Sequence, residues 1–565
     1  MAKKVLIIGG VAAGAKAASR IMRRDPEMEV IILERGEIIS YGACGLPFFI
    51  EDRVKNYEEL VSTPTGVIRN PVFFKNVKGV TVHIKTEAKK IDRENKIVSA
   101  VNHNTGEELE YPYDSLVLAV GGTPVMPPID GISLKNINKL STIEDGIVIK
   151  EKLAEKKIKQ AVIVGAGLIG LEMIEALKHW GTDVTVVEML DTVLPALLDR
   201  DMGLIVGDHL KSIGVRVLNS EAVIKFEGDE NGNVKKVITN KNELDADMVL
   251  MAIGVRPNIE LAKNAGLEIG ESGAIFVNEY LQTSDPSIYA GGDCAENTNL
   301  PTGKKVYAPM GSVANKHGRI IADHIIGNPV SFPGILQTGI CKVCGYNVGR
   351  TGLSEKDASA LGFDVETIIS PAPDRPHFYP GNQPIIIKLV ADKKNKKILG
   401  VQVIGPGDVA KRVDVVGTAL TFGATAEQLS SIDLAYAPPF SPALDNIITA
   451  AHVMMNKLSG LARGVSPLYV KEKLDNNDDF ILLDVRSPDE YNSIHIEHPN
   501  VKLIPLGKLR EEAKNLPVDK EIIAFCKISL RGYEAQRILD GYGFKDVKFM
   551  DGGVLAWPFD KITAD

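Results

Sequence analysis

The chain has 565 residues, of which 44% are hydrophobic and 24% charged, and its formal net charge is −8. The length predicts about three to five domains, while the acidic balance excludes a basic surface for nucleic acid and the lack of an apolar run of about 18 residues excludes a membrane span. Five cysteines scattered along so long a chain do not form a disulfide framework, so we expect a protein of the reducing cytoplasm.

The N-terminal stretch KKVLIIGGVAAGAKAASRIMRR predicts a strand, a glycine turn and a helix rather than a signal peptide. Gly9, Gly10 and Gly14 form the turn, and the next strand, EVIILER, ends at Glu34. In a βαβ unit of this spacing, the pyrophosphate of a dinucleotide lies at the helix N-terminus and the acidic side chain accepts hydrogen bonds from the ribose. Val11 replaces the middle glycine of the usual fingerprint, so a glycine turn that binds nothing is the alternative.

A second copy of the pattern follows in QAVIVGAGLIGLEMIEAL. Gly165, Gly167 and Gly170 stand in full register, and the next strand ends at Glu188, 23 residues after Gly165. A carboxylate within about 4 Å of a 2′-phosphate costs roughly 1–4 kcal/mol, and no Arg or Lys follows Glu188 before Arg200. The second site therefore predicts NADH rather than NADPH, and two sites in one chain suggest hydride transfer between two dinucleotides.

Two further segments, YPYDSLVLAVGGTP and LQTSDPSIYAGGDCAE, resemble the other FAD-contacting segments of the pyridine nucleotide-disulfide oxidoreductases. They lie on either side of the second unit, as in that family, and a buried strand and turn is the alternative. The resemblance implies FAD at the first site and NADH at the second, with Asp293 binding the ribityl-phosphate arm. The expected cofactor-binding residues are Gly9, Gly10, Gly14, Glu34, Arg35, Gly121, Asp293, Gly165, Gly167, Gly170 and Glu188.

A lone cysteine, Cys44, lies between these segments in SYGACGLPFF. The apolar pattern after it could begin a helix, and a helix N-terminus or a cation lowers the pKa of a thiol. The stretch resembles the single-cysteine branch of the family, namely coenzyme A-disulfide reductases, persulfide reductases, NADH oxidases and peroxidases. In the first two, the resemblance implies that coenzyme A supplies the second sulfur in a mixed disulfide.

Other interpretations of Cys44 remain. It could be a buried structural cysteine. Peroxidases of this branch carry a histidine where this chain has Ala12, so the peroxidase is disfavoured, whereas an NADH oxidase needs no such histidine.

Coenzyme A carries phosphates, so we expect cations along its path. Lys16, Arg20, Arg23 and Arg24 recur on the first helix, although a solvated basic face is the alternative. By resemblance, several residues fall where coenzyme A-disulfide reductases contact their ligand. With Lys16, the expected substrate-binding residues are Arg20, Arg23, Ser40, Asn315 and Lys316.

Residues 331–448 resemble the dimerisation domain of the family. There, Tyr379 and Tyr436 resemble the tyrosines that reach the active sulfur from the other subunit, which implies a homodimer; Phe378 stands where relatives can have tyrosine, and an aromatic packed in an interface is the alternative. A phenol could donate a proton to a leaving thiolate. The CKVC segment, Cys341–Cys344, has no second pair at metal-binding spacing, so we interpret it and Cys294 as structural and expect no metal.

The last hundred residues resemble a rhodanese domain. A strand runs into Cys526, and the six-residue loop CKISLR leads to a helix from about Gly532. Backbone N–H groups of such a loop form an anion nest that would stabilise a thiolate or a persulfide. Lys527 and Arg531 add positive charge, although Arg531 could instead only pin the loop to Asp484.

These interpretations predict an α/β protein with two Rossmann-like dinucleotide-binding domains, an α+β dimerisation domain and a C-terminal rhodanese-like α/β domain. The expected boundaries are 1–149 and 256–330 for the FAD-binding domain, 150–255 for the NAD-binding domain, 331–448 for dimerisation, 449–468 for a linker and 469–565 for the rhodanese-like domain.

The expected function is FAD-dependent reduction by NADH of coenzyme A persulfide or polysulfide at Cys44, with sulfur supplied by Cys526. Hydrogen sulfide and thiol would leave, and coenzyme A disulfide is a further expected substrate. The alternatives are a coenzyme A-disulfide reductase with a passive rhodanese docking module, and an NADH oxidase.

Overall fold

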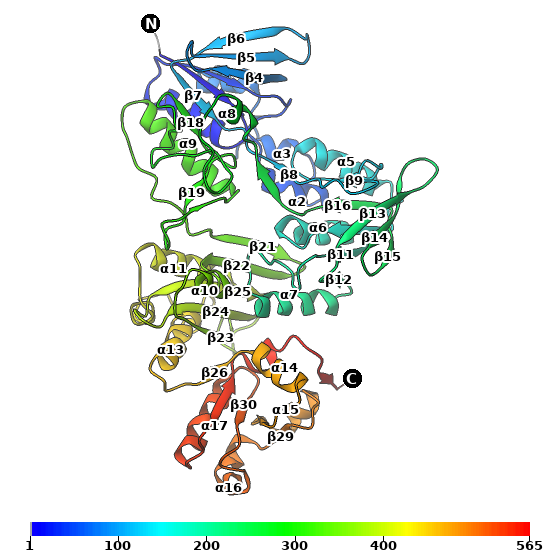
Figure 1. Cartoon of the computed structure of the whole chain (residues 1–565), viewed down its shortest axis with the longest axis vertical. Helices are drawn as coiled ribbons and strands as arrows, with labels where there is room; N and C mark the ends of the chain where they lie inside the picture. The colour runs from blue at the N-terminus through cyan, green and yellow to red at the C-terminus, as the bar shows by residue number, and fades with distance from the viewer. Residues whose placement is uncertain (1–2, 565) are drawn as a thin grey trace. The chain divides into compact units, whose positions relative to one another are not determined.

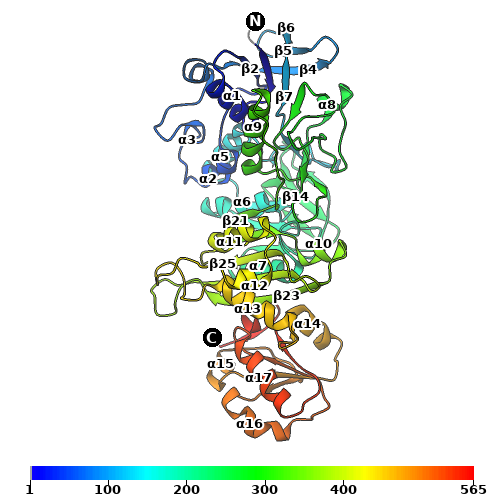
Figure 2. The same ribbon diagram turned by 90° about the vertical axis from the view of Figure 1, so that its left-hand side faces the viewer.

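The computed structural model of the chain describes residues 3–564. It falls into two units: one runs to Val187 and resumes at Ala222–Ile335, and the other contains Glu188–Glu221 and continues from Leu336. Figures 1 and 2 draw the chain from two sides. Each unit is described by itself below.

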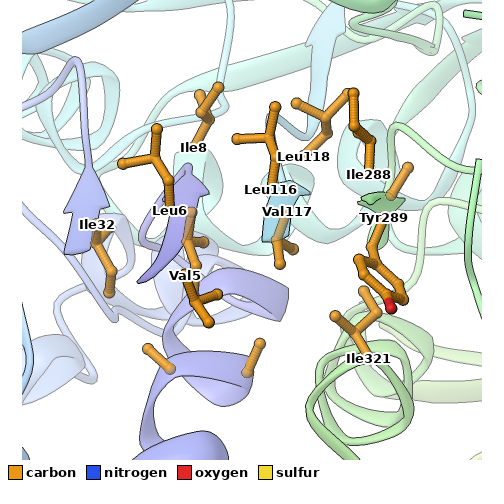
Figure 3. Close-up of a cluster of buried hydrophobic side chains, with 14 of the residues drawn as sticks. Val5, Leu6, Ile8, Ile32, Leu116, Val117, Leu118, Ile288, Tyr289 and Ile321 are labelled. Atoms are coloured by element: carbon orange, nitrogen blue, oxygen red, sulfur yellow. The ribbon is translucent and has the colours of Figure 1, made fainter. Parts of the chain in front are cut away.

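The first nucleotide domain is built on a parallel sheet in the order β18-β7-β1-β2-β3. Its strands are almost entirely apolar because both faces of a parallel sheet are covered. Figure 3 shows Val5, Val117 and Tyr289 on the face that the helices cover, with Ile321 of α9 beside Tyr289. The strands and the two helices are β1 (Lys4–Ile8), β2 (Glu29–Leu33), β3 (Thr81–His83), β7 (Ser115–Leu118), β18 (Ile288–Ala290), α1 (Ala13–Arg24) and α9 (Gly311–Ile325).

The second nucleotide domain repeats this plan with parallel strands in the order β11-β10-β16-β9. Although β18 and α9 follow this domain in sequence, β18 joins the first sheet and α9 packs on α1, so the first domain is formed from two separate stretches of chain. The elements are β9 (Ile137–Asn138), α5 (Ile143–Ala154), β10 (Gln160–Val164), α6 (Leu168–His179), β11 (Asp183–Val187) and β16 (Met248–Met251).

Smaller elements accompany these two domains. They are α2 (Leu46–Ile50), α3 (Glu58–Val61), α4 (Pro71–Phe73), the antiparallel sheets β4–β6 (Thr86–Asp92, Ile97–Asn102, Glu108–Pro112) and β13–β15 (Val223–Gly228, Val234–Thr239, Glu243–Asp245), the pair β8 (Gly122–Pro124) and β17 (Val255–Pro257), α8 (Glu260–Asn264), and the pair β19 (Asn297–Thr298) and β20 (Lys305–Val306).

The third domain has an antiparallel sheet in the order β21-β22-β25-β24-β23. Buried Lys388 on β24 holds helix α7 against this sheet, because its ammonium lies 2.7 Å from Asp201 of α7 and 2.6 Å from Glu355. The elements of this domain are β21 (Gly339–Val343), β22 (Tyr346–Gly352), α10 (Glu355–Ala360), β23 (Val365–Pro373), β24 (Pro384–Asp392), β25 (Ile398–Gly405), α11 (Ala410–Thr421), α12 (Ala426–Ser430) and α13 (Asn446–Leu458), and the same unit contains α7 (Arg200–Ser212) and β12 (Arg216–Leu218).

The fourth domain has a parallel sheet in the order β26-β31-β30-β27-β29. Its elements are β26 (Gly464–Val465), α14 (Pro467–Asp475), β27 (Ile481–Asp484), α15 (Pro488–Ser493), β28 (Ile494–His495), β29 (Val501–Leu503), α16 (Leu509–Glu512), β30 (Ile522–Phe525), α17 (Leu530–Gly541), β31 (Val547–Met550) and β32 (Ile562–Thr563).

The expected fold class is confirmed: two Rossmann-like domains, an α+β domain and a terminal α/β domain. The segment 449–468 is more ordered than a linker, because α13 continues to Leu458, β26 joins the fourth sheet and α14 begins at Pro467. Helix α17 begins at Leu530, two residues before the expected start. Within residues 3–564, no helix is long and apolar enough to cross a bilayer.

A buried ion cluster joins the fourth domain to the third. Lys457, near the end of α13, lies 3.0 Å from Asp551 and 3.3 Å from Glu366, and its ammonium donates a hydrogen bond to the Thr367 carbonyl at 2.6 Å. Asp551 is 3% exposed, and its Oδ1 has no hydrogen-bond partner among the described residues. Lys457 is therefore the cation that compensates a buried carboxylate at the junction.

We expect the variant Lys457→Met to destabilise the fourth domain by about 3–5 kcal/mol, because it leaves a buried charge uncompensated. Denaturant unfolding followed by the fluorescence of Trp557, in a Trp180→Phe background, measures this. The control is Lys545→Met, since Lys545 pairs with Asp519 at 2.6 Å on the surface of the fourth domain and a surface pair contributes less than about 1 kcal/mol. Equal effects of the two substitutions would contradict the role of the buried cluster.

Candidate functional site

The first glycine turn brings α1 very close to the strand before it. Gly9 has a φ of +101°, and a Cβ atom on Gly14 would lie 1.9 Å from the Gly9 carbonyl oxygen. No side chain caps the start of α1, so its first N–H groups are available for a phosphate. The buried Glu34 carboxylate accepts hydrogen bonds from the backbone N–H of Gly10 at 2.8 Å and of Gly36 at 2.9 Å.

The second glycine turn has the same geometry. Gly165 also has a φ of +101°, and a Cβ on Gly170 would lie 2.3 Å from the Gly165 carbonyl oxygen. Gly167 is the N-cap residue of α6 and provides no side-chain cap. Glu188 follows β11 directly and accepts a hydrogen bond from the Leu190 N–H at 2.9 Å. The two turns therefore repeat as structures, not only as sequence patterns.

Unsatisfied polar groups mark a ligand site at the carboxyl end of the first sheet. The Tyr307 hydroxyl is buried without a hydrogen-bond partner among the described residues, and a Cβ on Gly122 would lie 3.1 Å from it. Burial raises the pKa of the Asp293 carboxyl, and burial together with Asp293 raises the pKa of Tyr307. Because buried polar groups normally find partners, these residues fit a polar ligand such as the ribityl arm of FAD. Gly121, with a φ of +67°, precedes Gly122.

Sequence reasoning missed Tyr307 and also His317 of α9. The Gly292 N–H donates a hydrogen bond to His317 Nδ1 at 3.2 Å, and Nε2 has no partner among the described residues. Burial lowers the pKa of His317 to about 3. His317 is therefore a neutral side chain that holds the turn before Asp293. A histidine six residues into a helix gives no sequence signal for this contact.

Cys44 is exposed and lies in a 3₁₀ turn, Ala43–Gly45, just before α2. The expected lowering of its pKa is not found: although the residue is solvent-accessible, desolvation by the protein atoms around the sulfur raises the pKa of the thiol, as do the carboxylates of Glu172 and Asp293. The physical reason is that α2 has only five residues and no cation opposes these effects. A longer helix begins beside the sulfur instead, since a Cβ on Gly311, the first residue of α9, would lie 3.9 Å from Cys44 Sγ.

Helices α1 and α9 pack together, and most of the expected substrate-binding residues lie on them. Their backbones approach closely at Gly318, where a Cβ would lie 2.4 Å from the Ala13 carbonyl oxygen. Arg20 donates hydrogen bonds to both Asp323 oxygens at 2.9 Å, so its charge is already paired. Among the other expected binding residues and cations, Lys16 and Ser40 are half-buried. The exposed ones are Arg23, Arg24, Arg35, Asn315 and Lys316.

The two tyrosines of the third domain lie near a shared arginine. Arg375 lies 6.0 Å from the ring centre of half-buried Tyr379, and with Tyr436 it lines a hollow of about 640 Å³. Tyr436 is 52% exposed and Phe378 is 66% exposed. Exposed aromatic side chains of this kind are enriched at protein interfaces, which agrees with a dimerisation role.

Cys526 lies at the carboxyl end of β30, in a loop that its neighbours hold closed. Its carbonyl accepts a hydrogen bond from the Val554 N–H, and Ser529, with a φ of +92°, precedes α17 without capping it. Arg531 does not reach Asp484, which pairs with Arg486; its guanidinium bonds Glu490 at 2.6 and 2.8 Å. Glu490 and the Cys526 sulfur raise the pKa of Arg531.

The other cysteines fit structural roles. Cys294 is fully buried, and its thiol donates to the Leu118 carbonyl oxygen at 3.3 Å. Cys341 lies on β21, while Cys344 lies in the hairpin turn after it, with a φ of +48°. No cluster of three or more His, Cys, Asp or Glu side chains in residues 3–564 could hold a metal ion.

Three family models match the chain. Residues 3–316 match the pyridine nucleotide-disulphide oxidoreductases, 338–448 the dimerisation domain of the same family, and 466–558 the rhodanese-like domain. The NAD(P)H coenzyme A polysulfide/persulfide reductase of Pyrococcus horikoshii is 39% identical over 456 residues, which are 80% of this chain and 99% of that protein.

Two solved structures match almost the whole chain. An NAD-dependent persulfide reductase from A. fulgidus is 44% identical, with a TM-score of 0.93 over 98% of this chain and all of that one. The reduced CoADR-RHD of Bacillus anthracis is 35% identical, with a TM-score of 0.91 over 99% of this chain and 98% of that one. The fourth domain is thus covered along with the other three.

For the second nucleotide site we expect NADH to be used at least fivefold more efficiently than NADPH. The Glu188 carboxylate would repel a 2′-phosphate at a cost of roughly 1–4 kcal/mol. The variant Glu188→Ala should lower the ratio of kcat/KM with NADH to kcat/KM with NADPH, because it raises kcat/KM with NADPH. Equal efficiency with both nucleotides in the unmodified protein would contradict this expectation.

For His317 we expect a pH-dependent effect on stability. The unfolded chain binds a proton on this imidazole near pH 6.5 but the folded chain only near pH 3, so its contribution is full above about pH 6.5 and falls as the pH drops toward 3. In the unmodified protein the free energy of unfolding should therefore decrease between about pH 7 and pH 5, and His317→Gln should make this decrease smaller. Denaturant unfolding at each pH, monitored by flavin fluorescence, measures it.

A matched pair separates this titration from the hydrogen bond. Gln can still accept from the Gly292 N–H, whereas His317→Ala should weaken FAD retention by about 1 kcal/mol or more. Equal FAD retention in the Ala and Gln variants would show that the hydrogen bond does not position the turn.

Proposed function

Because the chain belongs to the pyridine nucleotide-disulphide oxidoreductases and ends in a rhodanese-like domain, it is an FAD- and NAD(P)H-dependent oxidoreductase, and we propose that it reduces coenzyme A persulfide or polysulfide with NADH at Cys44. The observation that carries the proposal is that Cys44 is exposed while Cys294, the other cysteine of its unit, is buried. The sulfur that Cys44 exchanges with must then come from the substrate.

The proposed first step conserves the number of S–S bonds. The Cys44 thiolate attacks the inner sulfur of coenzyme A persulfide, a Cys44–coenzyme A disulfide forms, the terminal S–S bond breaks, and HS⁻ leaves with its electron pair. Two electrons and a proton then return Cys44 thiolate and coenzyme A thiol. When bound, FAD supplies this electron pair, which it takes from NADH.

The residues of this chain have distinct proposed tasks around that exchange. The Gly9–Gly14 turn and Glu34 hold the pyrophosphate and ribose of FAD, while Asp293 binds the ribityl arm. The surface cations of α1 and α9, chiefly Arg23 and Lys316, bind coenzyme A phosphates; Arg20 contributes by aligning these helices through Asp323. Lys16, Ser40 and Asn315 line the same path.

We further propose a homodimer in which Tyr379 and Tyr436 act on the partner subunit's sulfur. The match of residues 338–448 to the dimerisation domain supports it, as does the exposure of Tyr436. Their hydroxyls are the proposed proton donors to the leaving thiolate.

The proposed role of Cys526 is to load coenzyme A. A persulfide on Cys526 passes its outer sulfur to the coenzyme A thiolate, which forms coenzyme A persulfide and regenerates the Cys526 thiolate. The uncapped start of α17 and the Arg531 guanidinium support such an anion. The alternatives predict different results: a passive docking module leaves coenzyme A disulfide as the main substrate, and an oxidase consumes NADH with oxygen alone.

We expect Cys44→Ser to lower NADH-dependent reduction of coenzyme A persulfide on the order of 10³-fold or more, as loss of a catalytic nucleophile does. Cys526→Ser should abolish sulfur transfer from a donor to coenzyme A but leave the reduction of preformed coenzyme A persulfide intact. Parallel NADH assays with coenzyme A persulfide and coenzyme A disulfide give the measurement. Turnover on the disulfide alone, in the unmodified protein, would reject the persulfide proposal.

A further inference from the structure

A cavity of about 310 Å³ lies against the rhodanese-like loop, within the second unit. One side is formed by residues that follow the carboxyl ends of parallel strands: Arg486 after β27, Lys527 after β30 and Val554 after β31. Ligands of parallel α/β sheets bind at this edge. We call this cavity the α7 pocket, because residues of α7 form its opposite side.

Backbone hydrogen bonds tie the wall of the α7 pocket to the loop that carries Cys526. Val554 and Leu555 of the pocket donate backbone hydrogen bonds to the carbonyls of Cys526 and Lys527. Glu490, which also lines it, orients Arg531 toward the sulfur. Cys526 is only 1% exposed, and its neighbour Lys527 lines the α7 pocket, so we take this pocket as the approach of a donor to the sulfur.

The opposite wall comes from outside the rhodanese-like domain. Asp208, His209 and Ser212 of α7 line it, and the His209 ring stacks on Tyr346 with centres 3.7 Å apart. Lys561, from the C-terminal segment, bonds Asp208 at 3.0 Å and so ties α7 to the rhodanese-like domain.

The position of this wall is fixed from behind. Lys388 of β24 bonds both oxygens of Asp201 on α7, at 2.7 and 2.9 Å, and this group is buried. The Lys457–Asp551 pair holds the rhodanese-like domain to β23 on the same unit. The α7 pocket is therefore bounded by two anchored surfaces.

Size and charge define what fits. A cavity of about 310 Å³ lies at the lower end of small-molecule sites, which span about 300–1,000 Å³. Among the charged groups at the pocket, Arg486 pairs with Asp484, Glu490 with Arg531 and Asp208 with Lys561. The exposed Lys527 adds one further positive charge. These features suit a small anion or a narrow thiol arm.

We propose that α7 is the specificity-determining wall of the rhodanese-like site, which admits a small anionic sulfane-sulfur donor and excludes a persulfide carried on a folded protein. This inference rests on the proposed role of Cys526 as a sulfur carrier. With thiosulfate, the Cys526 thiolate attacks the outer sulfur, the S–S bond breaks, and sulfite leaves with the electron pair. The extended pantetheine arm of coenzyme A is narrow enough to collect the sulfur by the same route.

The first experiment narrows the pocket. Full-length protein carrying Cys44→Ser is mixed with thiosulfate, and mass spectrometry follows the gain of one sulfur atom on Cys526. Ser212→Trp should lower the loading rate at least tenfold, while Lys211→Trp, on the adjacent exposed residue outside the pocket, should leave it unchanged. Circular dichroism confirms that both variants are folded. Equal loading in the Ser212→Trp and unmodified proteins would overturn the inference.

The second experiment opens the pocket. Iodoacetamide should modify Cys526 in the Cys44→Ser background, whereas a polymer-linked maleimide should react at least tenfold more slowly, and Lys561→Ala should reduce this difference. If a persulfidated carrier protein loads Cys526 as fast as thiosulfate does, this inference is overturned but the proposed sulfur relay is not. Failure of every donor to load Cys526 would overturn the proposed sulfur relay with it.

Discussion

Thiol–disulfide chemistry needs two sulfur atoms, and this constraint organises the molecule. The first unit offers one exposed sulfur, Cys44, because Cys294 is buried against the Leu118 carbonyl. The rhodanese-like domain likewise contains only Cys526. Under the proposed function, each site needs a mobile thiol to complete its chemistry, and the exposed cations Arg23, Lys316 and Lys527 are the groups that we propose to bind such a phosphorylated carrier.

The sequence alone was enough for the features that sterics dictate. Gly9, Gly14, Gly165 and Gly170 lie where a Cβ would collide with backbone, so their spacing reports the fold directly. The order of segments likewise predicted that a distant strand, β18, completes the first sheet. Boundaries were less certain: α13 extends through half of the expected linker because its apolar face packs on β23 and β24.

Contacts between distant residues could not be predicted in the same way. Arg20 fits a phosphate ligand by position, yet its partner is Asp323, 303 residues away. For Arg531, pairing with Asp484 is the alternative to a role beside Cys526, but Arg486 occupies that carboxylate and Arg531 bonds Glu490. His317 and Tyr307 gave no pattern, since their importance arises from unsatisfied atoms that only the folded chain brings into view. The pKa of Cys44 was misjudged for the same reason, because Glu172 belongs to another domain.

The Lys457–Asp551 pair has a consequence for dissecting the protein. A fragment that starts at the rhodanese-like domain proper would discard Lys457 and leave Asp551 and the neighbouring apolar surface without their cover. Such a fragment would be a poor reference for the intact molecule, whereas one that begins at Asn446 retains the whole of α13 and its cation. A fragment that preserves the Lys457–Asp551 pair must therefore begin inside the third domain, although the fourth domain looks separate in sequence.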